Sequence, residues 1–366
     1  YERIKFIMAY TTINKPTEHF TTTTWTGDNT SPKTFTTGTF KPDFLWGKDR
    51  DNAYSHQVYD TTRGAGNDKE LTPNSNIAES AQNADQYGYV SAFTSTGFTA
   101  TKGTESAGYD YWNRSADKYI GFSWKANGGT TSSNSDGDIT STVQANTTAG
   151  FSIVTWTSNG GNTATIGHGL GATPTHIIYK SRSSASGAWY NWINGSIDGS
   201  HDLMSLNTTG TKSNIDTSTY GSPSSTTISN FGFANNENMI AYCFVEKTGY
   251  SSFGSYTGNG SSNGTFIYLG FKPAFFMCKR HDSANNWTMY DNKRNNPFNE
   301  VTHTLIANGA DAESSSTSDD DCDFLSNGVK MRCTNNGSNG NNVGYFYMAF
   351  AEAPLVGTND IPCTAR

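Results

Sequence analysis

The stretch PDFLWGK (residues 42–48) decides the fold, because the chain contains three related versions of it. PTHIIYK (174–180) and PAFFMCK (273–279) share its plan of a proline followed six positions later by a lysine. A shorter motif precedes each proline by 17 or 18 residues and starts at Trp25, Trp156 and Tyr256. We therefore expect one structural unit to occur three times.

Each copy of the unit closes on a stretch of alternating residues. In the first copy, Ile120, Phe122 and Trp124 alternate with Gly121 and Ser123, which is the period-two pattern of a strand with one buried face. The small residues on the second face predict close approach by other backbone. Because no stretch shows a convincing helical periodicity, we predict an all-β protein. The three closing stretches are IGFSW (120–124), IAYCF (240–244) and FYMAF (346–350).

The repeat length defines the expected domain organisation. A period of roughly 100 to 130 residues is the size of an independent domain with its own core. We expect three tandem antiparallel β-sandwich modules, of jelly-roll or concanavalin-like type, arranged like beads on a string by internal duplication. Phe44, Ile177 and Phe276 are expected at equivalent core positions. The expected boundaries are an N-terminal arm (1–24), module one (25–126), a flexible connector (127–150), module two (151–248), module three (249–353) and a C-terminal tail (354–366).

Composition narrows the classes of function. Charged residues make up 16% of the chain and aromatic residues 13%, and the net charge is −7. A chain with this charge and no Lys/Arg run is a poor match for nucleic acid or an anionic membrane surface. No run of 18 or more apolar residues is present that could span a bilayer. The expected partners therefore include neither nucleic acid nor a membrane.

The first 24 residues do not resemble the repeat. Residues 1–7 precede MAYTTI (8–13), which reads like a natural protein start, so the first seven residues are a candidate leader. The rest of the arm, through the threonine run at 21–24, has no counterpart in the other copies. Such an arm either docks on a neighbouring protein or frays.

Two of the five cysteines flank a turn signal. Asn327-Gly328 predicts a tight β-hairpin in which Cys322 lies opposite Cys333. A hydrogen-bonded pair in that register has Cα atoms on the order of 5.5 Å apart, which is within disulfide range. A disulfide and a reduced pair both remain open, because the first two modules have no cysteines at this point.

The recurring lysines are the main candidate site residues. Lys48, Lys180 and Lys279 recur in step, and Arg50 and Arg182 follow two of them by two residues. In one interpretation, each lysine pairs with an aspartate on a neighbouring strand and helps to specify the fold. In the other, the five residues form a polar ligand or interface patch. Module two lacks the aspartate of the other two modules, which favours the structural interpretation.

Signatures of catalysis and of cofactor binding are missing from the sequence. It contains no His-Glu-x-x-His helix, no Gly-x-Ser-x-Gly elbow, no phosphate loop and no Cys-x-x-Cys pair. The seven histidines are scattered, and no strand carries the two carboxylates that a glycosidase needs. We therefore expect a protein that is not an enzyme and that binds neither a cofactor nor a metal.

Several stretches resemble the repetitive structural proteins of marine bacteriophages, which are known as a domain of unknown function or as candidate tail-fibre components. The resemblance covers nearly the whole chain from Met8 onward and includes a C-terminal part around YMAFAE (347–352). It is carried by MAYTTI (8–13), FSWKANGG (122–129), AGFSIVTWT (149–157) and GHGLG (167–171).

The resemblance implies a non-enzymatic virion structural protein, either a tail fibre or a decoration of the capsid or tail that contributes to host attachment. We expect it to be assembled in the host cytoplasm, exposed on the particle surface and anchored to other virion proteins through the N-terminal arm. A homo-oligomer is expected, with a trimer as one candidate. Loops rich in Asn, Ser, Thr and Tyr would suit weak multivalent contacts with host-surface glycans. The alternative is a lectin-like carbohydrate-binding protein without a virion role.

Overall fold

Strands account for most of the regular structure, as the sequence predicts for an all-β protein. The computed structural model describes residues 11–294, 299–315 and 320–352. Within these ranges the helical elements are short, and none is long and apolar enough to cross a membrane. They are η1 (Pro16–Glu18), α1 (Ala84–Tyr87) and α2 (Thr217–Tyr220).

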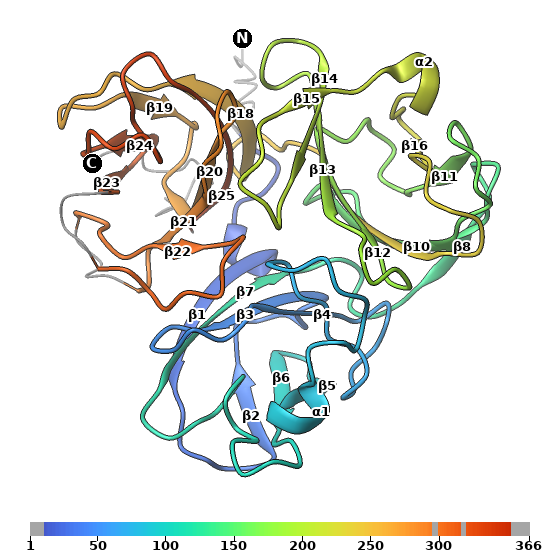
Figure 1. The fold of residues 1–366 in the computed structure, drawn as a ribbon, viewed down its shortest axis with the longest axis vertical. Helices are drawn as coiled ribbons and strands as arrows, with labels where there is room; N and C mark the ends of the chain where they lie inside the picture. Colours follow the sequence, from blue (N-terminus) through green and yellow to red (C-terminus); the bar gives the residue numbers. More distant parts are fainter. Residues whose placement is uncertain (1–10, 295–298, 316–319, 353–366) are drawn as a thin grey trace, which may run out of the picture.

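Three large antiparallel sheets form three lobes that surround a common centre (Figure 1). We name them lobe 1 (residues 20–126), lobe 2 (132–244) and lobe 3 (251–351). In lobe 1 the order is β1 (Phe20–Thr26), β7 (Lys118–Trp124), β3 (Phe44–Asp49), β4 (Gln57–Asp60). In lobe 2 it is β15 (Ser213–Asn214), β14 (His201–Ser205), β13 (Trp189–Asn194), β12 (His176–Ser181), β17 (Asn238–Phe244), β10 (Phe151–Thr157), β9 (Ser141–Asn146), β8 (Ser132–Asn134). In lobe 3 it is β18 (Ser251–Thr257), β25 (Gly344–Ala351), β20 (Pro273–Arg280), β21 (Trp287–Asp291), β22 (Leu305–Ile306).

The three large sheets share one strand order. The strand that ends in the opening motif pairs with the closing strand. The closing strand also pairs with the strand that carries the recurring lysine, and that strand pairs with the next one along the chain. The shared sets are β1-β7-β3-β4, β10-β17-β12-β13 and β18-β25-β20-β21. The register also repeats, because the residue two positions after each proline lies opposite the last aromatic residue of the closing strand. These pairs are Phe44 with Trp124, His176 with Phe244, and Phe275 with Phe350.

This register corrects the predicted core equivalence. Phe44 corresponds to Phe275 and faces the common centre, whereas Ile177 and Phe276 lie one position further along and face the interiors of their own lobes. Their counterpart in lobe 1 is Leu45. A shift of one residue in a strand moves a side chain to the opposite face, so the prediction aligned residues from two different faces.

A smaller sheet lies against each large sheet, with an apolar cluster between the two. In lobe 1 this cluster joins Leu45 to Phe98, in lobe 2 Ile177 to Ile228, and in lobe 3 Phe276 to Val329. The small sheets are β2 (Lys33–Thr36), β6 (Gly97–Thr101), β5 (Tyr89–Phe93) in lobe 1, β11 (Thr165–Gly167), β16 (Thr227–Ser229) in lobe 2, and β19 (Phe266–Tyr268), β24 (Gly328–Met331), β23 (Cys322–Leu325) in lobe 3.

The small residues of the closing strand face the interior of lobe 1, where they make room for tryptophan rings rather than for backbone. A Cβ atom placed on Gly121 would lie 3.2 Å from the ring of Trp25. On the neighbouring strand, a Cβ atom on Gly47 would lie 2.5 Å from the ring of Trp112. The Trp112 ring therefore leaves no room for a side chain at position 47, and the Trp25 ring leaves little room for one at position 121.

The second faces of the large sheets meet at the common centre and form one shared core. Rings from different lobes are in contact there: Phe44 and Tyr242 lie 4.4 Å apart, Phe122 and Phe275 5.0 Å, and Phe244 and Phe350 5.9 Å. The expected beads on a string are therefore wrong, because the lobes bury both faces of their central strands. The aromatic members of this core include Phe20, Phe44, Phe122, Trp124, Phe151, Tyr242, Phe244, Phe253, Phe275, Phe346 and Phe350.

Two segments between the predicted modules also belong to this body. Residues 127–150, expected to be a flexible connector, contain β8 and β9, which extend the large sheet of lobe 2. In the predicted arm, Ile13 is buried in the shared core and β1 already begins at Phe20. Residues 1–10 of the arm and the predicted tail 354–366 lie outside the described residues.

Candidate functional site

The three recurring lysines lie in three different lobes, so the structure does not bring them together as one patch. Each side chain is at most 1% exposed. The ammonium groups donate to backbone carbonyls rather than to aspartates, and Asp60 and Asp291 bind arginines instead. The lysine contacts are Lys48 to Asn52 O (2.9 Å), Lys180 to Asn76 O (3.1 Å) and Gly187 O (2.6 Å), and Lys279 to Thr209 O (3.2 Å) and Arg280 O (2.7 Å).

Each lysine marks a junction between two lobes. The residue two positions after the lysine offers its backbone carbonyl to an N–H group in a loop of the neighbouring lobe. Lobe 2 binds a loop of lobe 1, lobe 3 a loop of lobe 2, and lobe 1 a loop of lobe 3. The pairs are Glu79 N to Arg182 O (3.0 Å), Lys212 N to His281 O (2.9 Å) and Glu313 N to Arg50 O (2.7 Å).

A ring nitrogen completes each junction. In all three lobes the residue opposite the recurring lysine carries an indole or imidazole that binds a backbone carbonyl of the same neighbouring lobe. Trp189 donates to Thr72 O (2.9 Å) and Trp287 to Ser205 O (3.0 Å), while Nε2 of His56 lies 3.0 Å from Ile306 O. The three junctions therefore share one geometry, in which the contacts run in one direction around the centre.

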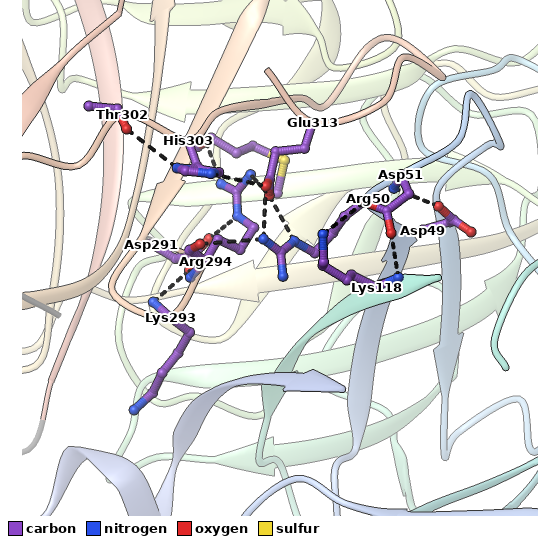
Figure 2. Close-up of polar contacts among 11 residues, drawn as sticks. Asp49, Arg50, Asp51, Lys118, Asp291, Lys293, Arg294, Thr302, His303 and Glu313 are labelled. Carbon is purple, nitrogen blue, oxygen red and sulfur yellow. Dashed lines mark hydrogen bonds and ion pairs between the residues drawn. The ribbon is translucent and has the colours of Figure 1, made fainter. Parts of the chain in front are cut away.

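The two candidate arginines bind glutamates across two of these junctions. Arg50 makes two hydrogen bonds of 2.8 Å to Glu313, and Arg182 lies 2.7 Å from Glu79. Figure 2 shows how the guanidinium groups of Arg50 and Arg294 meet at the Glu313 carboxylate. Arg294 also binds Asp291, so the junction between lobes 1 and 3 contains alternating charges.

The junction between lobes 2 and 1 repeats this network. Arg63 lies 2.5 Å from Asp60 and 2.7 Å from Glu79. Tyr242 of lobe 2 donates to Asp60 over 2.9 Å. The third junction departs from the pattern, because Lys212 replaces the glutamate and binds Asp198 (2.7 Å) and Asp202 (2.8 Å) within lobe 2.

Burial changes the protonation of the recurring lysines. Removal from water lowers the pKa of Lys180 to about 8, and it does the same for Lys48 and Lys279. Carboxylates near Lys48 oppose this shift only in part. The three ammonium groups are thus held by backbone dipoles in places where a charge is poorly solvated.

We predict that Lys180→Met destabilises the protein by about 1–3 kcal/mol at neutral pH, because the carbonyls of Asn76 and Gly187 lose their donor. The folded pKa of Lys180 lies below that of an unfolded lysine, so the unfolded chain holds more protons above about pH 8. The contribution of Lys180 to stability therefore rises as pH increases from that value, and the neutral amine still donates to both carbonyls. Urea unfolding at about pH 7 and about pH 9.5 should show a larger difference between wild type and variant at the higher pH. If the stability difference between wild type and variant were smaller at about pH 9.5 than at about pH 7, the lowered pKa of Lys180 would be contradicted.

The predicted cysteine pair is not formed. The hairpin turns at Ser326-Asn327 rather than at Asn327-Gly328, so Cys322 lies opposite Met331. Cys322 and Cys333 are both free and buried, and burial raises the pKa of both thiols. The pairing differs from the predicted one by two residues, which leaves every side chain on its predicted face.

Lobe 2 contains an open cleft that the sequence analysis did not single out. Its volume is about 460 Å³, within the usual range of roughly 300–1,000 Å³ for ligand pockets. In chain order, the capped turn at 216–221 takes the place of the third small-sheet strand of lobes 1 and 3, and no local sequence pattern reveals this difference. The cleft walls include Asn162, Tyr190, Leu203, Tyr220, Phe231 and Phe233.

A second cleft, of about 380 Å³, lies in lobe 1 and is more polar. Its charged groups already bind one another or a neighbouring hydroxyl: Arg114 contacts Tyr54 Oη at 3.1 Å and Asp110 at 3.9 Å. In the described part of the chain, no group of three or more His, Cys, Asp or Glu side chains is arranged to hold a metal ion. The lobe 2 cleft is therefore the better candidate for a small-molecule site.

Comparison with curated proteins gave no match. The family model described as a domain of unknown function, DUF7483, matches residues 15–354. This range begins before β1, ends after β25 and includes all three lobes and their junctions. The chain therefore belongs to the DUF7483 family.

Proposed function

We propose that this protein is a non-enzymatic structural protein of a bacteriophage particle, either a fibre or an appendage of the capsid or tail, which contributes to attachment to the host surface. The observation that carries the proposal is the use of the repeated charged residues to join three lobes into one body around a shared core. Such a body resists deformation, because no lobe can move without breaking apolar and ionic contacts with the others. The resemblance of the sequence to repetitive phage structural proteins points to the same role.

The internal organisation fits an origin by duplication. We interpret each lobe as a copy of one two-sheet sandwich module. The shared strand order, the shared register and the equivalent junction contacts support this interpretation. Insertions then distinguish the copies, for example the extra strands that widen the sheet of lobe 2.

The proposed role includes contacts with other molecules. The N-terminal segment would anchor the protein to other virion proteins, and the chain would assemble in the host cytoplasm, as a homo-oligomer, before it is exposed on the particle. Threonine, serine and asparagine side chains on the loops, with scattered aromatic rings, would contact host glycans weakly and repeatedly. Several weak contacts on one particle raise the effective affinity by about 10² to 10⁴.

We predict that gold-labelled antibodies against the purified chain decorate intact particles at regular positions. Particles treated with antibodies against an unrelated protein serve as the control. Purified protein incubated with host capsule or lipopolysaccharide should release no reducing sugar. Particles that lack the chain would overturn the virion role, and released oligosaccharide would overturn the non-enzymatic role.

The open cleft in lobe 2 favours a second candidate, a lectin-like carbohydrate-binding protein without a virion role. The two candidates differ in where binding occurs. A free lectin binds host cells as a purified monomer, whereas a virion protein binds them well only when displayed in many copies. Comparing the two formats on the same cells distinguishes the candidates.

A further inference from the structure

We propose that the cleft in lobe 2 is a binding site for a neutral pyranose sugar. This inference rests on the proposed role in host-surface adhesion and names the site and the ligand class within it. Four observations support it: the origin of the cleft, the exposure of Tyr190, the chemistry of the walls and the backbone conformation at Phe231.

The cleft lies where lobe 2 departs from the other two lobes. The small sheets of lobes 1 and 3 each have a third strand, β5 and β23, next to the central strand. The small sheet of lobe 2 has only β11 and β16, all within a fully described part of the chain. The segment that holds α2 runs beside this shortened sheet and leaves the large sheet partly uncovered.

Tyr190 lies on the part of the large sheet of lobe 2 that the shortened small sheet leaves uncovered. Tyr190 of β13 pairs with the residue just before the recurring lysine, as Gln57 and Thr288 do in lobes 1 and 3. Gln57 is 1% exposed and Thr288 is 2% exposed, whereas Tyr190 is half-buried and lines the cleft. The opening therefore exposes an aromatic ring at a position that is covered in the other two lobes.

The walls suit a sugar ring that carries no charge. Tyr220 lies 5.0 Å from Phe231 and Tyr190 lies 5.8 Å from it, so aromatic rings line a continuous surface. Aromatic rings bind the C–H faces of a pyranose, because these faces are apolar and the ring faces are electron-rich. Asn162, Ser213 and Asn214 add amide and hydroxyl groups that can bind sugar hydroxyls. None of the lining residues is charged, which favours a neutral ligand.

The backbone at the cleft is held in an uncommon conformation. Phe231 has a φ of 53°, in the left-handed region that bulky residues rarely adopt. Its ring is held against Trp192 at 5.3 Å, as well as against the two tyrosines. A Cβ atom on the next residue, Gly232, would lie 3.1 Å from both Asn162 Oδ1 and Tyr220 Cε1. The segment thus places the Phe231 ring and the Asn162 amide together at the mouth of the cleft. The strained backbone that this requires is typical of a functional site.

The test is a titration of the full chain with the methyl pyranosides of glucose, galactose, mannose and N-acetylglucosamine. Binding is measured by NMR and by calorimetry. Methyl glucuronide serves as the charged probe. We expect saturable binding of at least one neutral sugar, and binding of the glucuronide at least tenfold weaker, because no lining residue is a cation and Lys212, next to Asn214, is already paired with Asp198 and Asp202.

Two substitutions locate the site. Tyr220→Ala removes one aromatic wall, and Ser213→Trp fills the cleft from an exposed position without removing any buried group. Each should weaken sugar binding about tenfold or more, as expected for the loss of a central contact. Tyr268→Ala is the matched control, because Tyr268 is 64% exposed on lobe 3 and lies outside the cleft. Thermal melts of Ser213→Trp and Tyr268→Ala should match that of wild type, whereas Tyr220→Ala should melt somewhat lower because Tyr220 packs against Phe231.

Three outcomes overturn the proposal: no neutral sugar binds, the glucuronide binds as well as the neutral sugars, or Ser213→Trp binds like wild type. The gold-labelling experiment tests the virion role separately. A particle that carries the chain while no sugar enters the cleft contradicts only the ligand assignment.

Discussion

Truncation of Phe275 to alanine is expected to lower the free energy of unfolding by about 3–5 kcal/mol and to weaken all three lobes at once. Phe275 is fully buried in the shared core. Its ring lies 5.0 Å from Phe122 and 6.1 Å from Phe20, both of lobe 1, and 6.4 Å from Phe350 of lobe 3. Urea unfolding followed by tryptophan fluorescence and by far-UV circular dichroism should show one coincident transition at lower urea concentration.

Tyr268→Ala is the control for this prediction, because Tyr268 is a solvent-exposed aromatic residue on the same lobe. It should change stability by no more than about 0.5 kcal/mol. If Phe275→Ala produced two separate transitions, with lobes 1 and 2 unfolding as in wild type, the lobes would be energetically independent. That result would contradict the shared core.

The second large effect is expected for Arg63→Met, which should cost about 3–5 kcal/mol because it leaves the buried Asp60 carboxylate without its cation, whereas Glu79 keeps Arg182. Arg63 is buried and binds Asp60 at 2.5 Å and Glu79 at 2.7 Å. Asp60 also accepts a hydrogen bond from Tyr242, so the loss should extend to the contact between lobes 1 and 2. Chemical denaturation of the full chain measures the cost.

Lys118→Met is the matched control, since Lys118 forms an exposed pair with Asp51 at 3.6 Å in the same lobe. Exposed pairs of this kind contribute about 0–1 kcal/mol. Adding Asp60→Leu to Arg63→Met should recover part of the lost stability, because it removes the buried carboxylate left without a cation. An Arg63→Met variant within about 1 kcal/mol of wild type would show that the network has little structural role.

Local sequence pattern was sufficient to predict the strands but not the way in which the lobes pack. The alternation of Ile120, Phe122 and Trp124 with Gly121 correctly indicates a strand with different faces. It cannot show that both faces of the sheet are buried, one in the lobe and one at the centre. A further signal was present: Phe44, Leu45 and Trp46 form a continuous apolar run, which is typical of a strand covered on both faces.

The recurring lysines were interpreted incompletely for the same reason, because local sequence pattern does not show how the lobes pack against one another. Recurrence drew attention to Lys48, Lys180 and Lys279, but their partners are backbone carbonyls, two of them in other lobes, which no spacing rule reveals. In the hairpin, Gly328 is already a strand residue that pairs with Leu325 of β23 and with Tyr268 of β19, so it is not available to the turn that Asn327-Gly328 predicts. The cleft depends on a strand that lobe 2 lacks, and such an absence is visible only when the three lobes are compared in space.

The direction of the junction contacts has a consequence for synthesis on the ribosome. Lobe 1 binds lobe 3 through Arg50 and Glu313, residues from opposite ends of the chain. Until the last third of the chain has been translated, the emerged part exposes the rings of Phe122 and Trp124 that Phe275 later covers. The nascent chain therefore carries an unfinished aromatic surface from the synthesis of Phe122 until Phe275 is made, and exposed apolar surface makes incomplete chains prone to misassociate. Final stability is reached only when the closing strand β25 has left the ribosome.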